Sequence, residues 1–422
     1  MQFYFKQLFL WVFILGSLPL LAQFTLSSEF RFNPLYSRGF RKTFTETDNP
    51  GAYIHQRSRL ISEYKKEKDL EINLTIQDWR VWGDQNERKD IAELSLFRGY
   101  VHKWLTPKLS IKAGRQGLSY DDKHLFGGRN WGGKMAHDAA VLMYEDSTFK
   151  SHLILAYNAN GWEYNREAYN YNFYKSLQTL WLHKDWSKSK LSFIFVNRGL
   201  DKNSNKTIQY NQTTGLNLHH KFGNKLAIKA IYYYQFGRDT ARNTINANFI
   251  SIQAKIAATQ KLGITLGMDR GSGTDANKLN DPNNKTVNTF DRLYGLIHGH
   301  FGAMDYFYTK FNVPGTTDFY TKFKYKINDK WSVSDDVHAF MNSADVADPT
   351  DNTKMIDPFL GMENDITFSY KLDKDIKISI GHSIFFKTPS LEKTVFGGTS
   401  TRDNQFAFCV ITVNPTFFTI QN

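Results

Sequence analysis

The chain has 422 residues, and 53 lysines and arginines against 41 aspartates and glutamates give it a formal charge of +12 at pH 7. Its one cysteine excludes an internal disulfide. Beyond an apolar run near the N-terminus, no stretch is long and apolar enough for a membrane-spanning helix, which excludes a helical membrane protein. The basic residues are interspersed with acidic ones rather than clustered, so no nucleic-acid partner is expected.

The first residues have the pattern of a secretion signal. Lys6 is followed by an apolar run over residues 8–21 and then by the small residue Ala22. We therefore predict that residues 1–22 are a cleaved signal peptide. No linker rich in proline or serine divides the rest, so residues 23–422 are predicted to form a single domain.

Apolar and polar residues alternate in many segments of about ten residues. The alternation is clear over residues 70–77, 262–269 and 376–381, and it predicts strands with one face for lipid and one for water. The mean hydropathy of −0.48 agrees with this, because a membrane barrel exposes only alternate side chains to lipid. A soluble β-sandwich is the alternative, in which the apolar face would be buried.

Eight tight turns separate these segments, and longer polar connections lie between them. Short turns belong on the periplasmic side of an outer-membrane barrel and long loops outside. Eight short turns and nine long connections predict an all-β, antiparallel transmembrane barrel of about 18 strands with both termini periplasmic. The segment 405–420 is expected to close the sheet against the first strand. The turns are Lys66–Asp69, Leu105–Lys108, Glu145–Thr148, Ser187–Ser189, Gly223-Asn224, Thr259–Lys261, Asn328–Lys330 and Asp373–Asp375.

The water-facing positions of these strands include many basic residues. A narrow passage lined in this way favours anionic solutes, because its low-dielectric walls focus the field of the charges. The alternative interpretation is that lysines near turns contact lipid headgroups or solvent. The predicted inward residues are Arg57, Arg59, Lys112, Lys229, Lys322, Lys324, Lys326 and Lys377, with Asp269, Asp336, Glu363 and Asp365 as acidic counterparts.

Several motifs resemble those of alginate-export-type outer-membrane porins. They are Gly114-Arg115-Gln116, Gly128-Arg129-Asn130-Trp131, residues 137–141 (HDAAV), and a second block over residues 290–307 that is similar to Bacteroidetes-like members. The resemblance implies a monomeric barrel of eighteen strands with a charged conduit for an acidic polysaccharide. The expected partners are outer-membrane lipids, an anionic saccharide and the barrel-assembly machinery.

Four further residues are expected to line the pore or its constriction: Arg80, Arg115, Arg129 and Asp138. Strict alternation from Ile111 points Arg115 outward, whereas a bulge at Gly114 would turn it toward the lumen. Arg129 lies in a glycine-rich loop that is able to fold into the pore, with an ordinary exposed loop as the alternative.

The connection over residues 271–317 is a second candidate gate. Its aromatic block, residues 290–308, has too many rings to remain in water. These rings either cover the pore mouth, fold inside or extend strands beyond the membrane.

Two alternatives to a porin belong to other classes. Asp336 and His338 share a strand face, as an acid/base pair of a barrel hydrolase would, but no triad-like constellation appears, so no enzyme is expected. His298 and His300 face the same way on a strand, but without a third ligand neither a metal nor a cofactor is expected. A structural or adhesive barrel with a blocked lumen is the other alternative. The direction of transport stays open.

Overall fold

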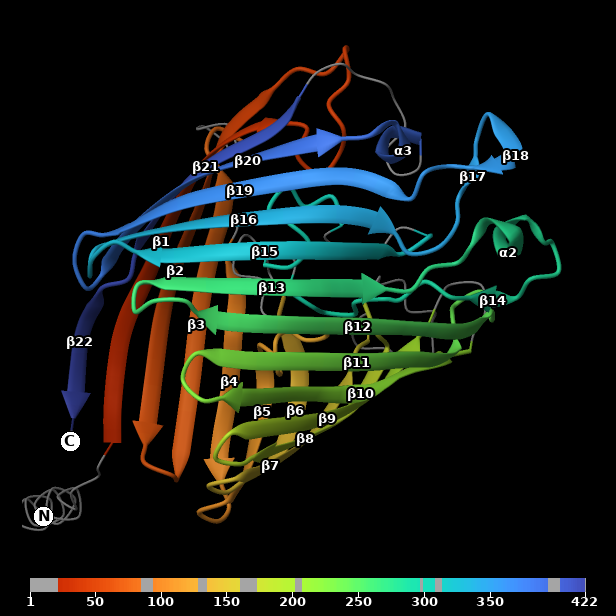
Figure 1. The fold of residues 1–422 in the computed structure, drawn as a ribbon. Helices are drawn as coiled ribbons and strands as arrows, with labels where there is room; N and C mark the ends of the chain where they lie inside the picture. Colours follow the sequence, from red (N-terminus) through yellow and green to blue (C-terminus); the bar gives the residue numbers. More distant parts are fainter. Residues whose placement is uncertain are drawn as a thin grey trace, which may run out of the picture.

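The computed structural model describes residues 22–84, 94–127, 135–159, 173–201, 207–296, 299–307, 313–393 and 403–421. These residues form one sheet of twenty segments. The two-residue segment β14 (Thr286–Val287) lies in a loop, and β21 and β22 together make the last wall strand, so eighteen antiparallel strands form the wall (Figure 1). The predicted fold class and strand number are confirmed.

The wall strands follow one another around the barrel in chain order. They are β1 (Ala22–Arg38), β2 (Gly51–Lys66), β3 (Leu70–Val81), β4 (Ser95–Trp104), β5 (Leu109–Gln116), β6 (His137–Glu145), β7 (Phe149–Tyr157), β8 (Ser176–Asp185), β9 (Ser189–Leu200), β10 (Gln209–Phe222), β11 (Leu226–Arg238), β12 (Thr244–Ala257), β13 (Leu262–Gly271), β15 (Thr316–Lys326), β16 (Trp331–Asn342), β19 (Phe359–Lys371), β20 (Ile376–Lys387), β21 (Asn404–Val413) and β22 (Thr416–Gln421).

The alternation of side chains separates a lipid face from an inner face. In β3, Leu74 is 47% exposed on the outside, whereas Thr75 is 2% exposed on the inside. A soluble sandwich would bury the apolar set, so this distribution favours the barrel. Exposed aromatic residues gather toward both ends of the wall, as they do at the two membrane interfaces of such barrels. They include Trp82, Tyr157 and Tyr210 at one end and Trp186, Phe222 and Trp331 at the other.

The barrel closes where the last strand meets the first. β1 pairs with β2 on one side and with β21 and β22 on the other. The break between β21 and β22 falls at Asn414 and Pro415, and the Ser28 amide donates to the Pro415 carbonyl at 3.0 Å. Closure by the C-terminal segment is therefore confirmed, and β22 ends beside the start of β1 (Figure 1).

All eight predicted turns join neighbouring strands at one end of the barrel, here called the short-turn end. The long connections lie at the opposite end of the barrel, here called the loop end (Figure 1). This end also holds α2 (Ala276–Asn280), α3 (Pro389–Leu391) and the hairpin of β17 (Ala347–Asp348) and β18 (Asp351–Met355). Among the described residues, no helix has the length and apolar character needed to cross a membrane.

Aromatic rings cover two glycines on the inner wall. A Cβ added at Gly381 would lie 2.1 Å from the Phe408 ring, and one at Gly267 would lie 2.3 Å from Tyr320. We expect Gly381→Val to displace Phe408 and to cost about 1–3 kcal/mol of stability, as overpacking does. The urea midpoint of barrel unfolding measures this. Gly263→Val is the matched control, because no atom of the described residues lies within 4 Å of its Cβ position. An equal loss in both variants would contradict the assignment to Phe408.

Candidate functional site

One side of the inner wall, formed by β1–β4, carries a row of arginines. Arg57 and Arg59 are 5% and 8% exposed and share the Glu29 carboxylate, at 2.5 and 3.2 Å. The Arg59 Nε donates to Gln77 at 2.8 Å, and its guanidinium lies 3.8 Å from the centre of the Phe97 ring. These contacts fix both arginines against the wall, where sequence alternation had placed them.

The row also includes Arg31 and Arg98, which sequence reasoning missed. Arg31 lies opposite Arg57 and therefore shares its face; the alternation of Phe30 and Phe32 was the signal for it. Arg98 lies opposite Thr75, but the pairing shifts so that Ile76 faces Leu96. That irregularity inserts one extra residue into β4, so simple alternation does not predict the direction of Arg98.

Lysine side chains from other positions of the inner wall also face the lumen. Lys112 lies opposite His102, and its ammonium is 3.8 Å from the centre of the Tyr100 ring. Lys229 forms an ion pair with Asp122 at 2.9 Å. The structure thus places these two predicted lumen lysines on the inner wall, each held by a specific neighbour.

The part of the inner wall formed by β13–β19 is richer in acids than expected. Lys322 donates to Asp336 at 2.9 Å and lies 3.4 Å from the Nε2 of His338, whose Nδ1 lies 2.8 Å from Asp318. The predicted pair of Asp336 and His338 is therefore bridged by a lysine. The described inner carboxylates of this side are Asp269 on β13, Asp318 on β15, Asp336 on β16, and Glu363 and Asp365 on β19.

The connection between β13 and β15 folds into the barrel, where its backbone forms hydrogen bonds with two of these acids. The Met304 and Ala303 amides donate to Glu363 at 2.7 Å and to Asp365 at 3.1 Å. Gly302 has a φ of +77°, and a Cβ there would lie 2.5 Å from the Glu363 carboxylate, so this approach requires glycine. Of the three arrangements open for the aromatic block, the described part adopts the inward one: Phe290, Phe301 and Phe307 are at most 1% exposed.

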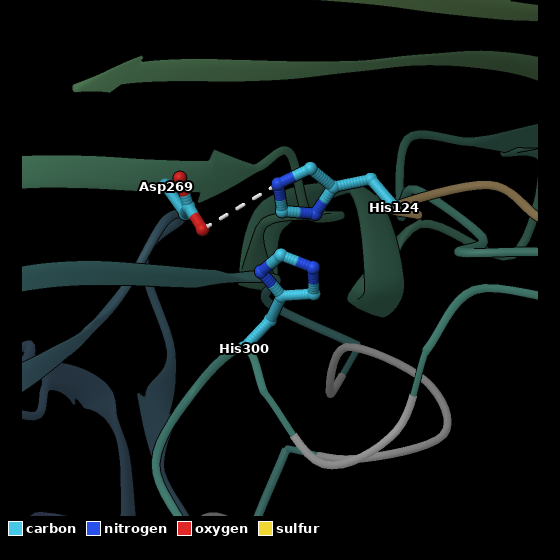
Figure 2. A group of neighbouring side chains, drawn as sticks. All are labelled: His124, Asp269 and His300. Carbon is cyan, nitrogen blue, oxygen red and sulfur yellow. Dashed lines mark ion pairs between the residues drawn. The ribbon is translucent and has the colours of Figure 1, made fainter. Parts of the chain in front are cut away.

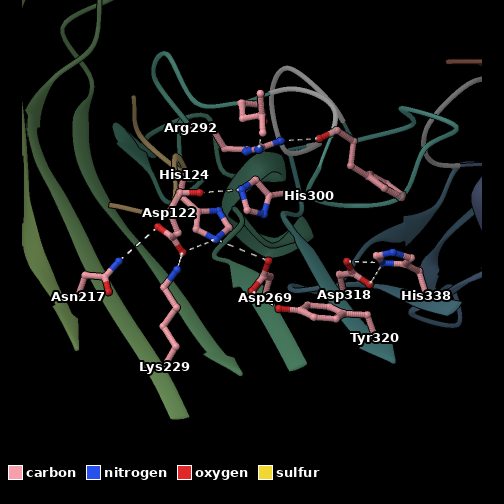
Figure 3. Close-up of polar contacts among 12 residues, drawn as sticks. Asp122, His124, Asn217, Lys229, Asp269, Arg292, His300, Asp318, Tyr320 and His338 are labelled. Atoms are coloured by element: carbon pink, nitrogen blue, oxygen red, sulfur yellow. Dashed lines mark hydrogen bonds and ion pairs between the residues drawn. The ribbon is translucent and has the colours of Figure 1, made fainter. Parts of the chain in front are cut away.

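The connection between β5 and β6 folds inward as well. Asp122 accepts from Asn217 at 3.3 Å, in addition to its ion pair with Lys229 (Figure 3). The neighbouring Asp121 accepts from the Trp181 indole at 3.1 Å, and burial raises the pKa of the Asp121 carboxyl. The two inward connections also join each other, because the Leu296 amide donates to the Lys123 carbonyl at 2.8 Å. Together they narrow the lumen.

Open space remains on the short-turn side of these connections. A cavity of about 780 Å³ is here called the vestibule. Among the described residues, its lining has one carboxylate, Asp336, and six lysines: Lys221, Lys225, Lys255, Lys322, Lys324 and Lys377. A cavity of about 280 Å³ lies deeper, between the wall and the inward connections. Lys326 instead pairs with Asp329 at 2.7 Å in the turn, in agreement with the solvent-contact alternative for lysines near turns.

Three predicted pore residues lie on the outer face, which corrects the expectation for them. Arg115 pairs with Asp138 at 2.8 Å, and the Asp138 side chain is 58% exposed. Strand pairing continues through Gly114 without a register shift, both with β4 and with β6, so no bulge turns Arg115 inward. Arg80 forms an ion pair with Asp78 at 2.9 Å and follows the outward parity of Ile76.

Several predictions fall outside the described residues. They concern the signal segment over residues 1–21, Arg129 with the rest of residues 128–134, His298, and the end of the aromatic block at Tyr308.

Comparison with known proteins agrees with this architecture. The family model described as alginate export matches residues 43–395. The chain is similar in structure to OccAB1 of Acinetobacter baumannii (TM-score 0.63, 10% identity, 94% of this chain and 97% of that one) and OccAB4 of the same organism (0.61, 10%, 93% and 98%). OccK11 of Pseudomonas aeruginosa is also similar (0.59, 13%, 94% and 96%). No curated protein matches the sequence.

Proposed function

The chain belongs to the alginate export family and forms an outer-membrane porin barrel, and from that premise we propose that it gives anionic saccharides passive passage. The vestibule carries this proposal, because it presents six lysines and one carboxylate to a solute at the short-turn end. Such a cluster raises the local concentration of anions at the entrance of a narrow passage. The barrel acts as a monomer in the outer membrane of a Gram-negative bacterium, with both termini periplasmic.

The arginine row provides the next contacts along the passage. Guanidinium groups bind carboxylates through two parallel hydrogen bonds, a geometry that suits a uronate better than a chloride ion. Glu29 neutralises part of the row through Arg57 and Arg59. A sugar carboxylate exchanges places with Glu29 as a partner, so binding stays weak enough for release.

Four of the five described carboxylates on the acidic side of the lumen have partners inside the protein and therefore do not oppose this passage. Glu363 and Asp365 accept backbone amides of the inward connection, and Asp336 and Asp318 are paired with Lys322 and His338. These carboxylates serve as hydrogen-bond and ion-pair partners within the protein. The passage conducts along whichever gradient exists, so export of a polymer and uptake of an oligomer use the same residues.

The test is single-channel conductance of the refolded full chain, with the reversal potential measured under a salt gradient. We expect anion preference and block by an oligouronate, and we expect Lys324→Gln with Lys377→Gln to reduce both, because each change removes a vestibule charge. Lys103→Gln with Lys184→Gln is the matched control, since both lysines have the outward parity near the short turns. A cation-selective current without uronate block would contradict the proposal.

A barrel with a blocked lumen is the second candidate, and the depth to which the two connections fill the interior favours it. Its outer loops would then bind a partner, and the barrel would only anchor them. Absence of any single-channel current from correctly folded protein would support this candidate instead.

A further inference from the structure

Three side chains from distant parts of the chain converge inside the barrel. His124 comes from the connection between β5 and β6, His300 from the connection between β13 and β15, and Asp269 from β13 itself. One potential ligand atom from each lies within 4.8 Å of the other two. Figure 2 shows the two imidazole rings and the carboxylate turned toward a common point.

Each of these histidines has a ring nitrogen available to a ligand. His124 is 1% exposed, and neither of its ring nitrogens forms a hydrogen bond with another described residue. An imidazole buried without a hydrogen bond carries a free-energy cost, which a ligand at one nitrogen would offset. His300 donates its Nε2 hydrogen to the Asp122 carbonyl at 3.1 Å, which leaves its Nδ1 as the acceptor. A ligating histidine in a metal site is usually held in this way by a carbonyl oxygen.

The distances among these groups are close to the spacing of ligands around one ion. The His124 Nε2 lies 3.3 Å from the Oδ2 of Asp122 and 3.8 Å from that of Asp269. Ligands about 2.0–2.2 Å from a tetrahedral ion are themselves about 3.3–3.6 Å apart. Asp122 is positioned by Lys229 and Asn217, and its carboxylate lies beside the His124 ring (Figure 3).

We propose that His124, His300 and Asp269 bind a divalent transition-metal ion of the Zn²⁺ class. Two imidazoles and a carboxylate without cysteine suit borderline ions, whereas Ca²⁺ and Mg²⁺ prefer sites made entirely of oxygen. A neutral imidazole binds such an ion through the lone pair of one ring nitrogen.

The ion would tie both inward connections to the wall at one point. Existing contacts between the connections include the backbone hydrogen bond from the Leu296 amide to the Lys123 carbonyl and the hydrogen bond from His300 to the Asp122 carbonyl. A metal bridge from His124 through His300 to Asp269 adds a cross-link between three segments and fixes the narrow part of the lumen. This inference rests on the geometry of the site and not on which solute passes.

The experiment uses the full chain, refolded in detergent and stripped of metal with a chelator. Titration calorimetry with Zn²⁺ measures stoichiometry and affinity, and the visible absorption of added Co²⁺ reports coordination by nitrogen and oxygen. We expect one ion per chain. His124→Gln and His300→Gln should each weaken binding by at least ~100-fold, since loss of a ligand exceeds the effect of losing a supporting partner.

His102→Gln is the matched control. His102 also faces the lumen beside a carboxylate, with its Nδ1 3.8 Å from Glu71, but it lies on β4 away from the site. It should leave the affinity unchanged. Folding of each variant is checked by its heat-dependent migration in electrophoresis, and Asp269→Asn replaces any histidine variant that does not fold. No stoichiometric Zn²⁺ binding, or equal loss of affinity in the His102 variant, would overturn the proposal.

Discussion

Removing the inward part of the connection between β13 and β15 should raise the single-channel conductance severalfold. The change replaces residues 290–312 with a short Gly-Ser-Gly link, which is feasible because the Thr289 hydroxyl lies 2.5 Å from the Val313 carbonyl. The deleted segment includes Phe301 and Phe307, both buried inside the barrel. A barrel of 16–18 strands has room for an aqueous channel once its interior is cleared.

The control is removal of a segment that lies outside the barrel. Deleting residues 347–355, which contain the β17–β18 hairpin (Figure 1), should leave conductance unchanged. Folding of both variants is compared by heat-dependent migration. Unchanged conductance in the first variant would assign the narrowest part of the lumen to the connection between β5 and β6, where Asp122 and His124 lie.

Strand alternation and turn residues were sufficient to predict the barrel. Leu74 and Thr75 point in opposite directions because the side-chain period of a strand is two. The same rule placed Arg57 and Arg59 on the inner wall and, read strictly, would have placed Arg115 on the outer face. The expectation that Arg115 lines the pore followed the family resemblance instead, and the continuous pairing through Gly114 shows why the strict rule holds there.

The interior could not be predicted in the same way. The contact between the Met304 amide and Glu363 joins residues 59 positions apart, and that between His300 and the Asp122 carbonyl joins residues 178 apart. Loop paths of this kind depend on side-chain packing and not on any period in the sequence. His300 was considered with His298 as a metal ligand, but its partners His124 and Asp269 lie on other segments, so no spacing in the sequence indicates the set.

Replacing Arg57 and Arg59 together by glutamate should reduce the anion preference of the channel more than any other exchange of two charges. The exchange turns two positive groups of the arginine row into negative ones and sets them beside Glu29, their present partner. Arg31 and Arg98 then remain as the cations of a row that holds three carboxylates. We expect the reversal potential under a salt gradient to shift toward the cation value and the block by an oligouronate to weaken, since both depend on the local field.

The outer-face arginines provide a control of equal charge. Arg80→Glu with Arg115→Glu makes the same change in net charge, but these side chains pair with Asp78 and Asp138 on the outer face. If selectivity follows the field inside the lumen, only the inner pair changes it. If both pairs shift the reversal potential equally, the net charge of the protein governs the current. If neither does, Arg57 and Arg59 lie away from the path of the ions, and the vestibule lysines become the selective element.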